Sequence, residues 1–365
     1  MVSIGRRSAA KALAVSAPLL AMGGRAALGQ LVPGATWETI AQKEAGFDPA
    51  GLAALELELV TLPTTAFMVV TKGRVAYSYG DNAQVCYLAS ARKSILSMLY
   101  GKYVENGTIN LDRTMGELGI DEPDGLLPIE KSAKIRDLLI ASSGVYHAAG
   151  SPGDDPDKIE RGSKQPGTFF HYNNWDFNVL GAIFEKLTGK TVFAAMEQEL
   201  ARPLQFQDFE PARQRMMGFE NQSRYLAYHT FLSGRDMARL GVLMAAGGKW
   251  NGQQIVPAAW VKESTQEHVP ADKVGRGGGL GYGYLWWIPE TRTAPQWAGA
   301  FMASGQFGQF ILVLPAIDTV IVHRRAVSDE YAVLRNLGKT QFEPTRVLAP
   351  DFLKLADRVV AAKAA

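Results

Sequence analysis

The stretch TAFMVVTKGRVAYSYG, residues 65–80, decides how this chain is expected to fold. It contains two runs rich in β-branched and aromatic residues joined at Lys72-Gly73, a pattern typical of a β-hairpin. Near the other end, QFILVL (residues 309–314) and TVIVH (residues 319–323) predict two further strands on either side of Pro315-Ala316-Ile317-Asp318. Strands at both ends of the chain predict an antiparallel sheet assembled from the two termini.

The segment between these strands has the apolar spacing of helices. Pro- and Gly-rich loops such as SPGDDPD, residues 151–157, separate the helical runs. The predicted fold class is α+β, an antiparallel sheet built from both chain ends and flanked by helices. A mostly helical region is inserted at about residues 100–270, within one large domain of residues 35–361. Helices are expected at residues 48–61, 91–105, 135–141, 175–187, 192–200, 234–246 and 351–365.

Composition excludes several classes of protein and site. The chain has 365 residues, of which 47% are hydrophobic and 20% charged, so it can bury a large core. Its one cysteine, Cys86, excludes an intramolecular disulfide, and a net charge of +2 argues against a nucleic-acid partner. The five histidines lack metal-ligand spacing, and no glycine loop precedes a helix as in nucleotide-binding proteins. We therefore expect neither a metal nor a cofactor.

Residues 1–29 have the layout of a cleavable export signal. Basic residues, among them the pair Arg6-Arg7, precede a modest apolar stretch, and small residues follow, which favours the twin-arginine route. The apolar part is too short for a spanning helix, so no stable membrane insertion is expected. The segment contains four basic residues and no acid, so its removal would change the net charge from +2 to −2. We expect a periplasmic or secreted protein; a disordered basic terminus is the alternative.

The strongest candidate for chemistry is Ser90-Ala91-Arg92-Lys93, at the start of a predicted helix. Lys93 lies three residues after Ser90 and therefore on the same helical face. A serine hydroxyl needs a base to become a nucleophile, and a desolvated lysine can be that base. The Ser-x-x-Lys pattern fixes only two residues and is weak evidence by itself. The alternative is a helix-capping serine followed by a solvated lysine. Ser78 is the nearest match to a second type of serine motif, the Gly-x-Ser-x-Gly nucleophile elbow. It belongs to a strand pattern without the helix that such an elbow needs, so we interpret it as structural.

Two later motifs strengthen this candidate. Tyr172 and Asn174 lie two residues apart before a predicted helix; beside a lysine, a tyrosine can relay protons and an amide can orient the lysine. Packing by Tyr172 and helix capping by Asn174 are the alternatives. The stretch Ser304-Gly305-Gln306 leads into a hydrophobic strand, and glycine there would let a substrate approach the backbone of an edge strand. A backbone N–H there, with that of Ser90, would form an oxyanion hole; a simple turn or bulge is the alternative.

Together the three ordered motifs resemble the serine β-lactamase-like family. That family includes class C β-lactamases, penicillin-recognising DD-peptidases, family VIII esterases and 6-aminohexanoate-dimer hydrolases. The resemblance extends over residues 48–325 and includes the flanking segments IRDLL (135–139) and GYGYLWW (281–287). It implies a β-lactamase/DD-peptidase-like fold, with Ser90, Lys93 and Tyr172 as catalytic residues and Asn174, Ser304, Gly305 and Gln306 as substrate-binding residues.

The third motif departs from the family pattern. β-Lactamases and DD-peptidases usually carry a lysine or histidine on this strand, whereas Ala303-Ser304-Gly305 has no cation. This favours a serine hydrolase that cleaves uncharged carboxylic esters or small amides through an acyl-enzyme on Ser90. An arginine from elsewhere in the chain could still supply the charge. The alternatives are a β-lactamase or DD-peptidase and, in another class, a non-catalytic cell-wall-binding protein with the same fold. The implied partner is a small-molecule ester or amide.

Overall fold

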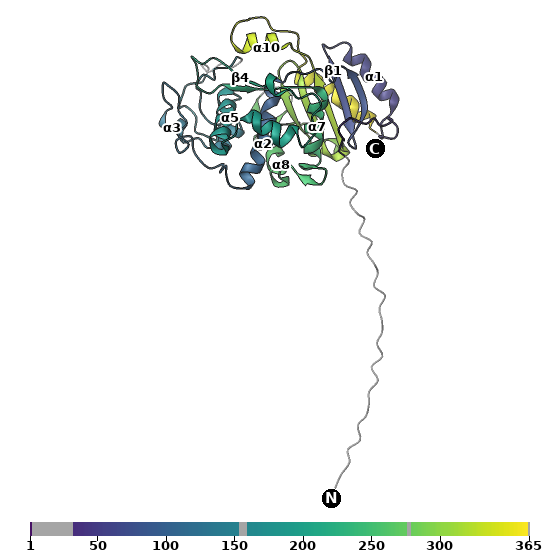
Figure 1. Cartoon of the computed structure of the whole chain (residues 1–365), viewed down its shortest axis with the longest axis horizontal. Coiled ribbons are helices and arrows are strands. Elements are labelled where there is room, and N and C mark those ends of the chain that lie inside the picture. The colour runs from purple at the N-terminus through teal and green to yellow at the C-terminus, as the bar shows by residue number, and fades with distance from the viewer. Residues whose placement is uncertain (2–31, 153–158, 276–278, 364–365) are drawn as a thin grey trace.

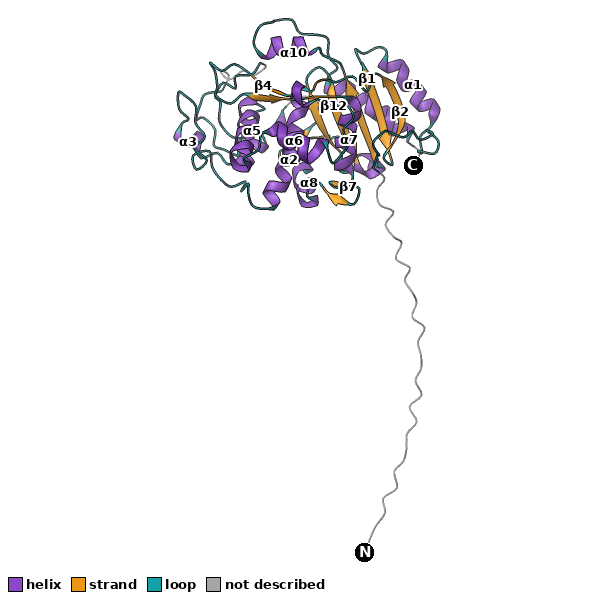
Figure 2. Ribbon diagram, viewed as in Figure 1, coloured by secondary structure: helices purple, strands orange, loops and turns teal. Residues whose placement is uncertain are grey.

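The computed structural model describes residues 1, 32–152, 159–275 and 279–363 (Figure 1). The predicted export signal lies outside these ranges except for Met1, so it stays a prediction. Figure 2 shows a sheet on one side of the molecule that adjoins a mostly helical region. Among the described helices, none has both the length and the apolar character needed to cross a bilayer.

Seven strands form one antiparallel sheet in the order β2-β1-β13-β12-β11-β10-β9. Within this sheet β1, from the N-terminal part, pairs with β13, from the C-terminal part, and Figure 1 shows the purple strands beside yellow ones. The predicted α+β fold, with a sheet built from both ends of the chain, is therefore confirmed. The strands are β1 (Ala66–Thr71), β2 (Arg74–Gly80), β9 (Gly281–Tyr282), β10 (Trp287–Ile288), β11 (Phe301–Gly305), β12 (Gln309–Leu314) and β13 (Thr319–Arg324).

Helix α7 (Gly234–Ala245) packs against β1, β12 and β13. It begins after Ser233, whose hydroxyl accepts a hydrogen bond from the Asp236 N–H at 3.1 Å. A Cβ atom at Gly241 would lie 2.4 Å from Cγ1 of Val320 on the sheet, so only glycine allows this close approach of helix and sheet.

Helices α1 (Pro49–Leu59) and α11 (Ala349–Ala362) pack against each other at the side of the sheet where the described chain ends (Figure 1). The Asp48 side chain caps α1 by accepting from the Ala50 N–H at 3.1 Å, and proline occupies the first helical position, as the sequence predicts. The two ends of the chain thus support one another as well as the sheet.

The other helices and short strands lie mainly between β2 and β9, where the insertion was expected; the limits 35–361 and 100–270 stay predictions. One cluster of buried apolar side chains extends from the sheet to α2 and α5 and includes Val69, Leu96 and Phe177. The elements are α2 (Arg92–Glu105), α3 (Pro128–Lys131), α4 (Ile135–Leu139), α5 (Asn174–Thr188), α6 (Val192–Met196), α8 (Ala258–Thr265), α9 (Ala271–Val274), α10 (Asp329–Asn336), β3 (Cys86–Tyr87), β4 (Arg215–Met217), β5 (Ala227–His229), β6 (Phe231–Leu232), β7 (Lys249–Trp250) and β8 (Gln253–Gln254).

Two departures from the sequence predictions concern the C-terminal half. The Gly-rich stretch before β12 is itself a strand, β11, and it lies between β12 and β10, so it is not an edge strand as expected. Helix α10 follows β13 and was not predicted. Its Ala332 is fully buried in a small second apolar cluster with Tyr87 and Phe307, which fixes the helix over one end of the sheet.

His323, on β13, is a titratable group buried within the sheet. Its Nδ1 lies 2.7 Å from the Gly308 carbonyl oxygen and its Nε2 lies 3.0 Å from Thr64 Oγ1. One N–H and one free ring nitrogen satisfy these two partners, because a threonine hydroxyl can donate. Burial lowers the pKa of His323 to about 4, so the imidazole is neutral in the folded protein at pH 7.

This predicts a loss of stability as the pH falls from about 6.5 towards 4. The unfolded chain takes up a proton on His323 in this range while the folded chain does not, a difference of up to about 3 kcal/mol. In His323→Gln, the free energy of unfolding should fall less steeply over the same range in urea titrations. Equal slopes for the wild-type protein and the variant would contradict the prediction.

Candidate active site

The candidate site is organised around the Lys93 ammonium, which is only 1% exposed. Its Nζ donates to three oxygens, Ser90 Oγ at 3.0 Å, Tyr172 Oη at 2.8 Å and Asn174 Oδ1 at 2.8 Å. Three acceptors match the three protons of an ammonium group. The structure therefore brings the predicted base, Lys93, into contact with Ser90, Tyr172 and Asn174, and the alternative of a solvated lysine is wrong.

Ser90 lies in a short 3-10 turn, Ala89–Ala91, that continues directly into α2. Its hydroxyl therefore stands near a helix N-terminus, where the peptide dipoles favour negative charge. The preceding residue, Ala89, has a φ of +48°, which is uncommon for a residue with a Cβ atom. This backbone conformation marks the turn as locally strained, a feature that clusters at functional sites.

The Tyr172-x-Asn174 motif is held by the start of α5. The helix cap is Asn173, whose side chain accepts from the Asp176 N–H at 2.9 Å, so the capping role considered for Asn174 is wrong. The Asn174 side chain is thereby left to face Lys93. The Tyr172 ring packs on Phe177 at 4.7 Å and Trp287 at 5.4 Å between ring centroids. Tyr172 is therefore both a packed tyrosine and a partner of Lys93.

Arg92 and Asn178 tie α2 to α5 beside this centre. Arg92 Nη2 donates to Asn178 Oδ1 at 3.3 Å, and Asn178 Nδ2 donates to the Ala149 carbonyl at 3.1 Å. The same amide nitrogen lies 3.2 Å from Ser151 Oγ. Arg92 is 3% exposed and has no carboxylate partner among the described residues. A buried, unneutralised guanidinium thus lies one residue from Lys93.

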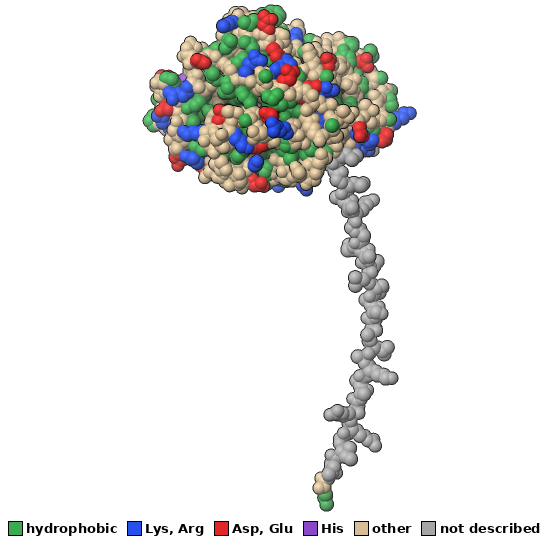
Figure 3. All heavy atoms as spheres, viewed as in Figure 1, with side chains coloured by type: hydrophobic (Ala, Val, Ile, Leu, Met, Phe, Trp, Pro, Cys, Tyr) green, Lys and Arg blue, Asp and Glu red, His purple; other side chains and the backbone are tan. Residues whose placement is uncertain are grey.

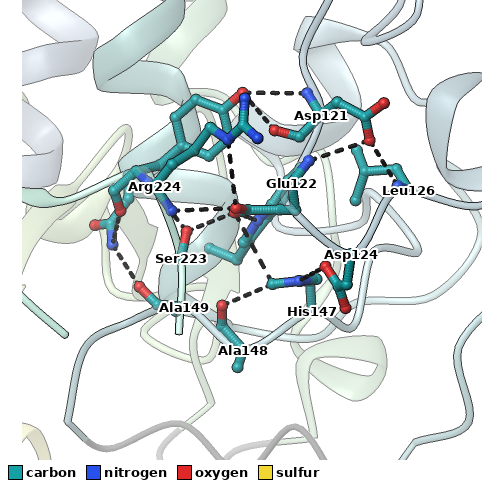
Figure 4. A network of polar contacts seen from close by, with 12 residues as sticks. Asp121, Glu122, Asp124, Leu126, His147, Ala148, Ala149, Ser223 and Arg224 are labelled. Carbon is teal, nitrogen blue, oxygen red and sulfur yellow. Dashed lines mark hydrogen bonds and ion pairs between the residues drawn. The ribbon is translucent and has the colours of Figure 1, made fainter. Parts of the chain in front are cut away.

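A second polar network near the start of α5 is centred on Glu122, which Figure 4 shows together with Ser223, Arg224 and His147. This buried carboxylate accepts from Trp175 Nε1 at 2.8 Å, from Ser223 Oγ at 2.5 Å and from the Arg224 N–H at 3.1 Å. Trp175 directly follows Asn174, so the network fixes the backbone that carries the Tyr172-x-Asn174 motif. In Figure 4, His147 lies beside Glu122; its Nε2 is 2.8 Å from Asp124 Oδ1.

The third motif approaches Ser90 through Gly305. A Cβ atom there would lie 2.3 Å from the Leu88 carbonyl oxygen and 3.0 Å from the Ala91 nitrogen, so only glycine lets β11 pack against the Ser90 turn. Along its other edge β11 pairs with β10 only at Met302, which leaves its end free of strand partners on that side. Ser304 and Gln306 line the same cavity as Ser90. Gly305 instead packs against the backbone of the Ser90 turn.

The cavity at this centre has a volume of about 440 Å³. The third-motif strand β11 carries no cation, but Arg92, Arg335 and Arg346 from other parts of the chain line the cavity. These residues are candidates for the alternative left open by the sequence, an arginine from elsewhere in the chain. Arg335 and Asn336 follow Ala332 by three and four residues, so the burial of Ala332 directs them to the same side. The lining residues are Tyr87, Ala89, Ser90, Arg92, Ser151, Pro152, Tyr172, Asn174, His229, Trp287, Ser304, Gln306, Arg335, Asn336 and Arg346.

Sequence reasoning did not find His229, Arg335, Asn336 or Arg346. Arg92 stands inside the Ser90-x-x-Lys93 motif and could have been noticed there, but the others carry no local pattern. Within the described ranges, no three His, Cys, Asp or Glu side chains gather as a metal ion would require. The site as described is therefore built from hydroxyl, amine, amide, imidazole and guanidinium groups.

Comparison with known proteins gives the family. The model of the Beta-lactamase family matches residues 52–323, about three quarters of the chain. The chain belongs to the Beta-lactamase family. No curated protein matches the sequence.

Solved structures share the fold of this Beta-lactamase family member at low sequence identity. A structure from Bacillus anthracis, named for 6-aminohexanoate-dimer hydrolase, is 20% identical, covers 82% of this chain and 85% of its own, and gives a TM-score of 0.60. A family VIII carboxylesterase is 14% identical over 90% of this chain and 99% of its own, with a TM-score of 0.61. A penicillin-binding protein homologue from Caulobacter crescentus is 16% identical over 80% and 97%, with a TM-score of 0.53. These likenesses establish the β-lactamase-like fold.

The close approach of Gly305 to the Ser90 turn predicts a cost for any side chain there. Gly305→Ala should lower the free energy of unfolding by about 1–3 kcal/mol, because the methyl group must displace backbone atoms. Gly34→Ala is the matched control, since a Cβ atom at Gly34 meets nothing within 4 Å. The control should change stability by less than about 0.5 kcal/mol in the same urea titrations. A Gly305→Ala protein as stable as the control would refute the close contact.

Proposed function

We propose that this protein is a serine hydrolase that cleaves carboxylic esters or small amides through an acyl-enzyme on Ser90. The observation that carries the proposal is the contact of Lys93 Nζ with both Ser90 Oγ and Tyr172 Oη on the wall of a cavity large enough for a small molecule. A nucleophile, a base and a second proton carrier within hydrogen-bond reach are the parts that acyl transfer needs.

In the proposed acylation step, Lys93 has lost the ammonium proton that points to Ser90 Oγ, and the lone pair of the resulting neutral amine accepts the proton of the Ser90 hydroxyl. Ser90 Oγ then forms a bond to the substrate carbonyl carbon. The backbone N–H groups of Ser90 and Gln306 hold the oxyanion that develops, at the helix N-terminus and the end of β11. Tyr172 gives its proton to the leaving alcohol or amine as the carbonyl–heteroatom bond breaks, and takes a proton from Lys93.

In the proposed deacylation step, Tyr172 passes its proton to Lys93 as its oxygen accepts a proton from a water molecule, and the resulting hydroxide attacks the acyl carbon. The bond to Ser90 Oγ breaks and the serine regains its proton through Lys93. Asn174 orients Lys93 throughout by accepting one of its protons at 2.8 Å. No step uses a metal or a cofactor.

The structural neighbours support hydrolysis without deciding the substrate. They include proteins named as a carboxylesterase, a 6-aminohexanoate-dimer hydrolase and penicillin-binding protein homologues. The arginines in the cavity favour a second candidate, a β-lactamase or DD-peptidase with the same centre, because the substrates of those enzymes carry a carboxylate. A non-catalytic cell-wall-binding protein would not need Lys93 buried against Ser90 and Tyr172. The proposal includes export of the enzyme by residues 1–29 to the periplasm or the medium.

Replacement of Ser90 tests the covalent step. A fluorophosphonate probe should label the wild-type protein, and Ser90→Ala should abolish labelling and lower ester turnover roughly 10,000-fold or more, because the acyl-enzyme cannot form. Ser78→Ala is the control and should label normally, since Ser78 is exposed on β2. Labelling of Ser90→Ala would contradict the mechanism, and blockage of wild-type labelling by penicillin would favour the β-lactamase candidate.

Replacement of Lys93 and Tyr172 separates their two roles. Lys93→Ala removes the base and should slow acylation roughly 100- to 10,000-fold. Tyr172→Phe removes only the hydroxyl, so acylation by an activated ester should lose less rate than overall turnover. Stopped-flow measurement of the p-nitrophenol burst reports acylation and its steady state reports turnover. Near-normal acylation by Lys93→Ala across neutral pH would rule Lys93 out as the base.

A further inference from the structure

The turn between β11 and β12 carries a backbone N–H group without an acceptor among the described residues. Gln306 is the first residue after β11, and its N–H forms no hydrogen bond to any residue in the described part of the chain. Backbone donors removed from water are normally paired, so an unpaired one needs an explanation. Gln306 is half-buried and lines the cavity beside Ser90. Its N–H is thus available to a group that enters the cavity.

The backbone of this turn needs support from its surroundings. Phe307, the residue after Gln306, has a φ of +72°. A positive φ is uncommon for a residue with a Cβ atom and persists only where neighbouring groups impose it. The Val347 N–H donates to the Phe307 carbonyl oxygen at 3.1 Å, so the segment that follows α10 contacts the turn directly. The position of the Gln306 N–H therefore depends on groups outside the sheet.

Three side chains form a closed set of hydrogen bonds beside the turn, which we call the arginine clamp. Arg335 Nε donates to Glu343 Oε1 and Arg335 Nη2 donates to Gln306 Oε1, both at 2.9 Å. Gln306 Nε2 in turn donates to Glu343 Oε2 at 3.3 Å. The guanidinium carbon of Arg335 also lies 5.6 Å from the centre of the Phe307 ring, within the range of a cation–π contact. One arginine thus contacts two consecutive residues of the turn.

The arginine clamp differs from an ordinary surface ion pair. On the face of the molecule in Figure 3, acidic and basic side chains are interspersed, and exposed pairs of this kind contribute little stability. Arg335 by contrast is buried, at 8% exposure, although its partner Glu343 is exposed. Helix α10 carries Arg335, and Ala332, three residues earlier, is fully buried in one apolar cluster with Phe307. The arginine is therefore fixed by its own helix as well as by the turn.

We propose that Arg335 and Glu343 are positioning residues, which hold the Gln306 N–H where it donates to the oxyanion formed at Ser90. The inference rests on the proposed hydrolase function and extends it to residues outside the three sequence motifs. An oxyanion donor is effective when its place is fixed before the reaction, because the site then needs no reorganisation as charge develops. The side chain of Gln306 connects the turn to α10, while its backbone N–H contacts the substrate.

An ester and its thionoester test the inference on the full-length protein. In O-(4-nitrophenyl) butanethioate, a C=S group replaces the C=O group of 4-nitrophenyl butyrate. Sulfur is larger than oxygen and a weaker hydrogen-bond acceptor, so a fixed oxyanion site discriminates against it. Each kcat/KM is divided by the rate constant for hydroxide-catalysed hydrolysis of the same compound, and the ratio of ester to thionoester is called the oxygen preference. The wild-type protein should have an oxygen preference of at least about tenfold.

Two substitutions break the arginine clamp and leave the Gln306 N–H in the chain. Arg335→Met and Gln306→Met each keep an unbranched side chain but cannot form the 2.9 Å hydrogen bond between these two residues. Each should lower the oxygen preference by about tenfold, because a displaced donor no longer reaches the oxyanion. The double variant should lose no more than either single variant, since both remove the same link. If Arg335→Met does not fold, Gln306→Met decides the test.

Two arginine variants serve as controls. Arg346→Gln removes a positive charge from the same cavity but leaves the arginine clamp complete, so it reports the effect of charge alone. Arg358→Gln breaks an exposed ion pair with Glu58 between α11 and α1, so it reports the effect of losing an arginine–glutamate pair elsewhere. Whatever their rates, both controls should have the oxygen preference of the wild-type protein.

The outcomes separate this inference from the proposed function. Ser90-dependent hydrolysis in which Arg335→Met and Gln306→Met keep the oxygen preference, whatever their rates, would overturn the clamp and leave the hydrolase intact. Losses that multiply in the double variant, or an equal loss in Arg346→Gln, would overturn the clamp as well. So would a wild-type protein without an oxygen preference, because it would have no oxyanion contact to position. Absence of Ser90-dependent hydrolysis and labelling would instead overturn the proposed function, and the inference with it.

Discussion

Burial of the Lys93 side chain is the constraint on which the rest of the site depends. An ammonium group removed from water needs an acceptor for each of its protons, and here the three acceptors come from two separate parts of the chain. Ser90 comes from the turn before α2, whereas Tyr172 and Asn174 come from the start of α5. The two helices must therefore be placed closely relative to one another for these hydrogen bonds to form. Polar contacts between α2 and α5, and between α5 and Glu122, provide this placement.

Those contacts form two supports that act on the same backbone. Asn178 joins α2 to α5 through Arg92, and Glu122 holds Trp175, the residue after Asn174, together with Ser223. Each support consists of buried groups joined by hydrogen bonds inside the protein, so a shift of either helix would leave several donors unpaired. Rigid placement of this kind suits a centre in which proton transfers take place over hydrogen-bond distances.

The sheet and α10 complete the cavity from the other side. Gly305 allows β11 to touch the Ser90 turn, and the Arg335 side chain links α10 to Gln306 and Glu343. The loop that carries Arg346 then follows, before α11 returns to pack on α1. Two of the three arginines that line the cavity, Arg335 and Arg346, thus come from a part of the chain outside the three motifs, whereas Arg92 lies within the first motif.

The sequence by itself determined the features that depend on neighbours along the chain. Hairpin patterning in residues 65–80 and 309–323 predicted the sheet, and the three-residue spacing of Ser90 and Lys93 placed both on one helical face. The Tyr172-x-Asn174 pair was predicted to belong to the site because it follows the Ser90-x-x-Lys93 motif in the chain, in the order typical of the family. Only the tertiary structure decided that Asn173 is the cap, that β11 is an inner strand, and that His229, Arg335 and Arg346 meet at the cavity. Those residues lie up to 256 positions from Ser90. An isolated arginine or histidine looks the same in a sequence whether it faces solvent or a cavity, because its role is set by the packing of distant elements such as Ala332 against Tyr87.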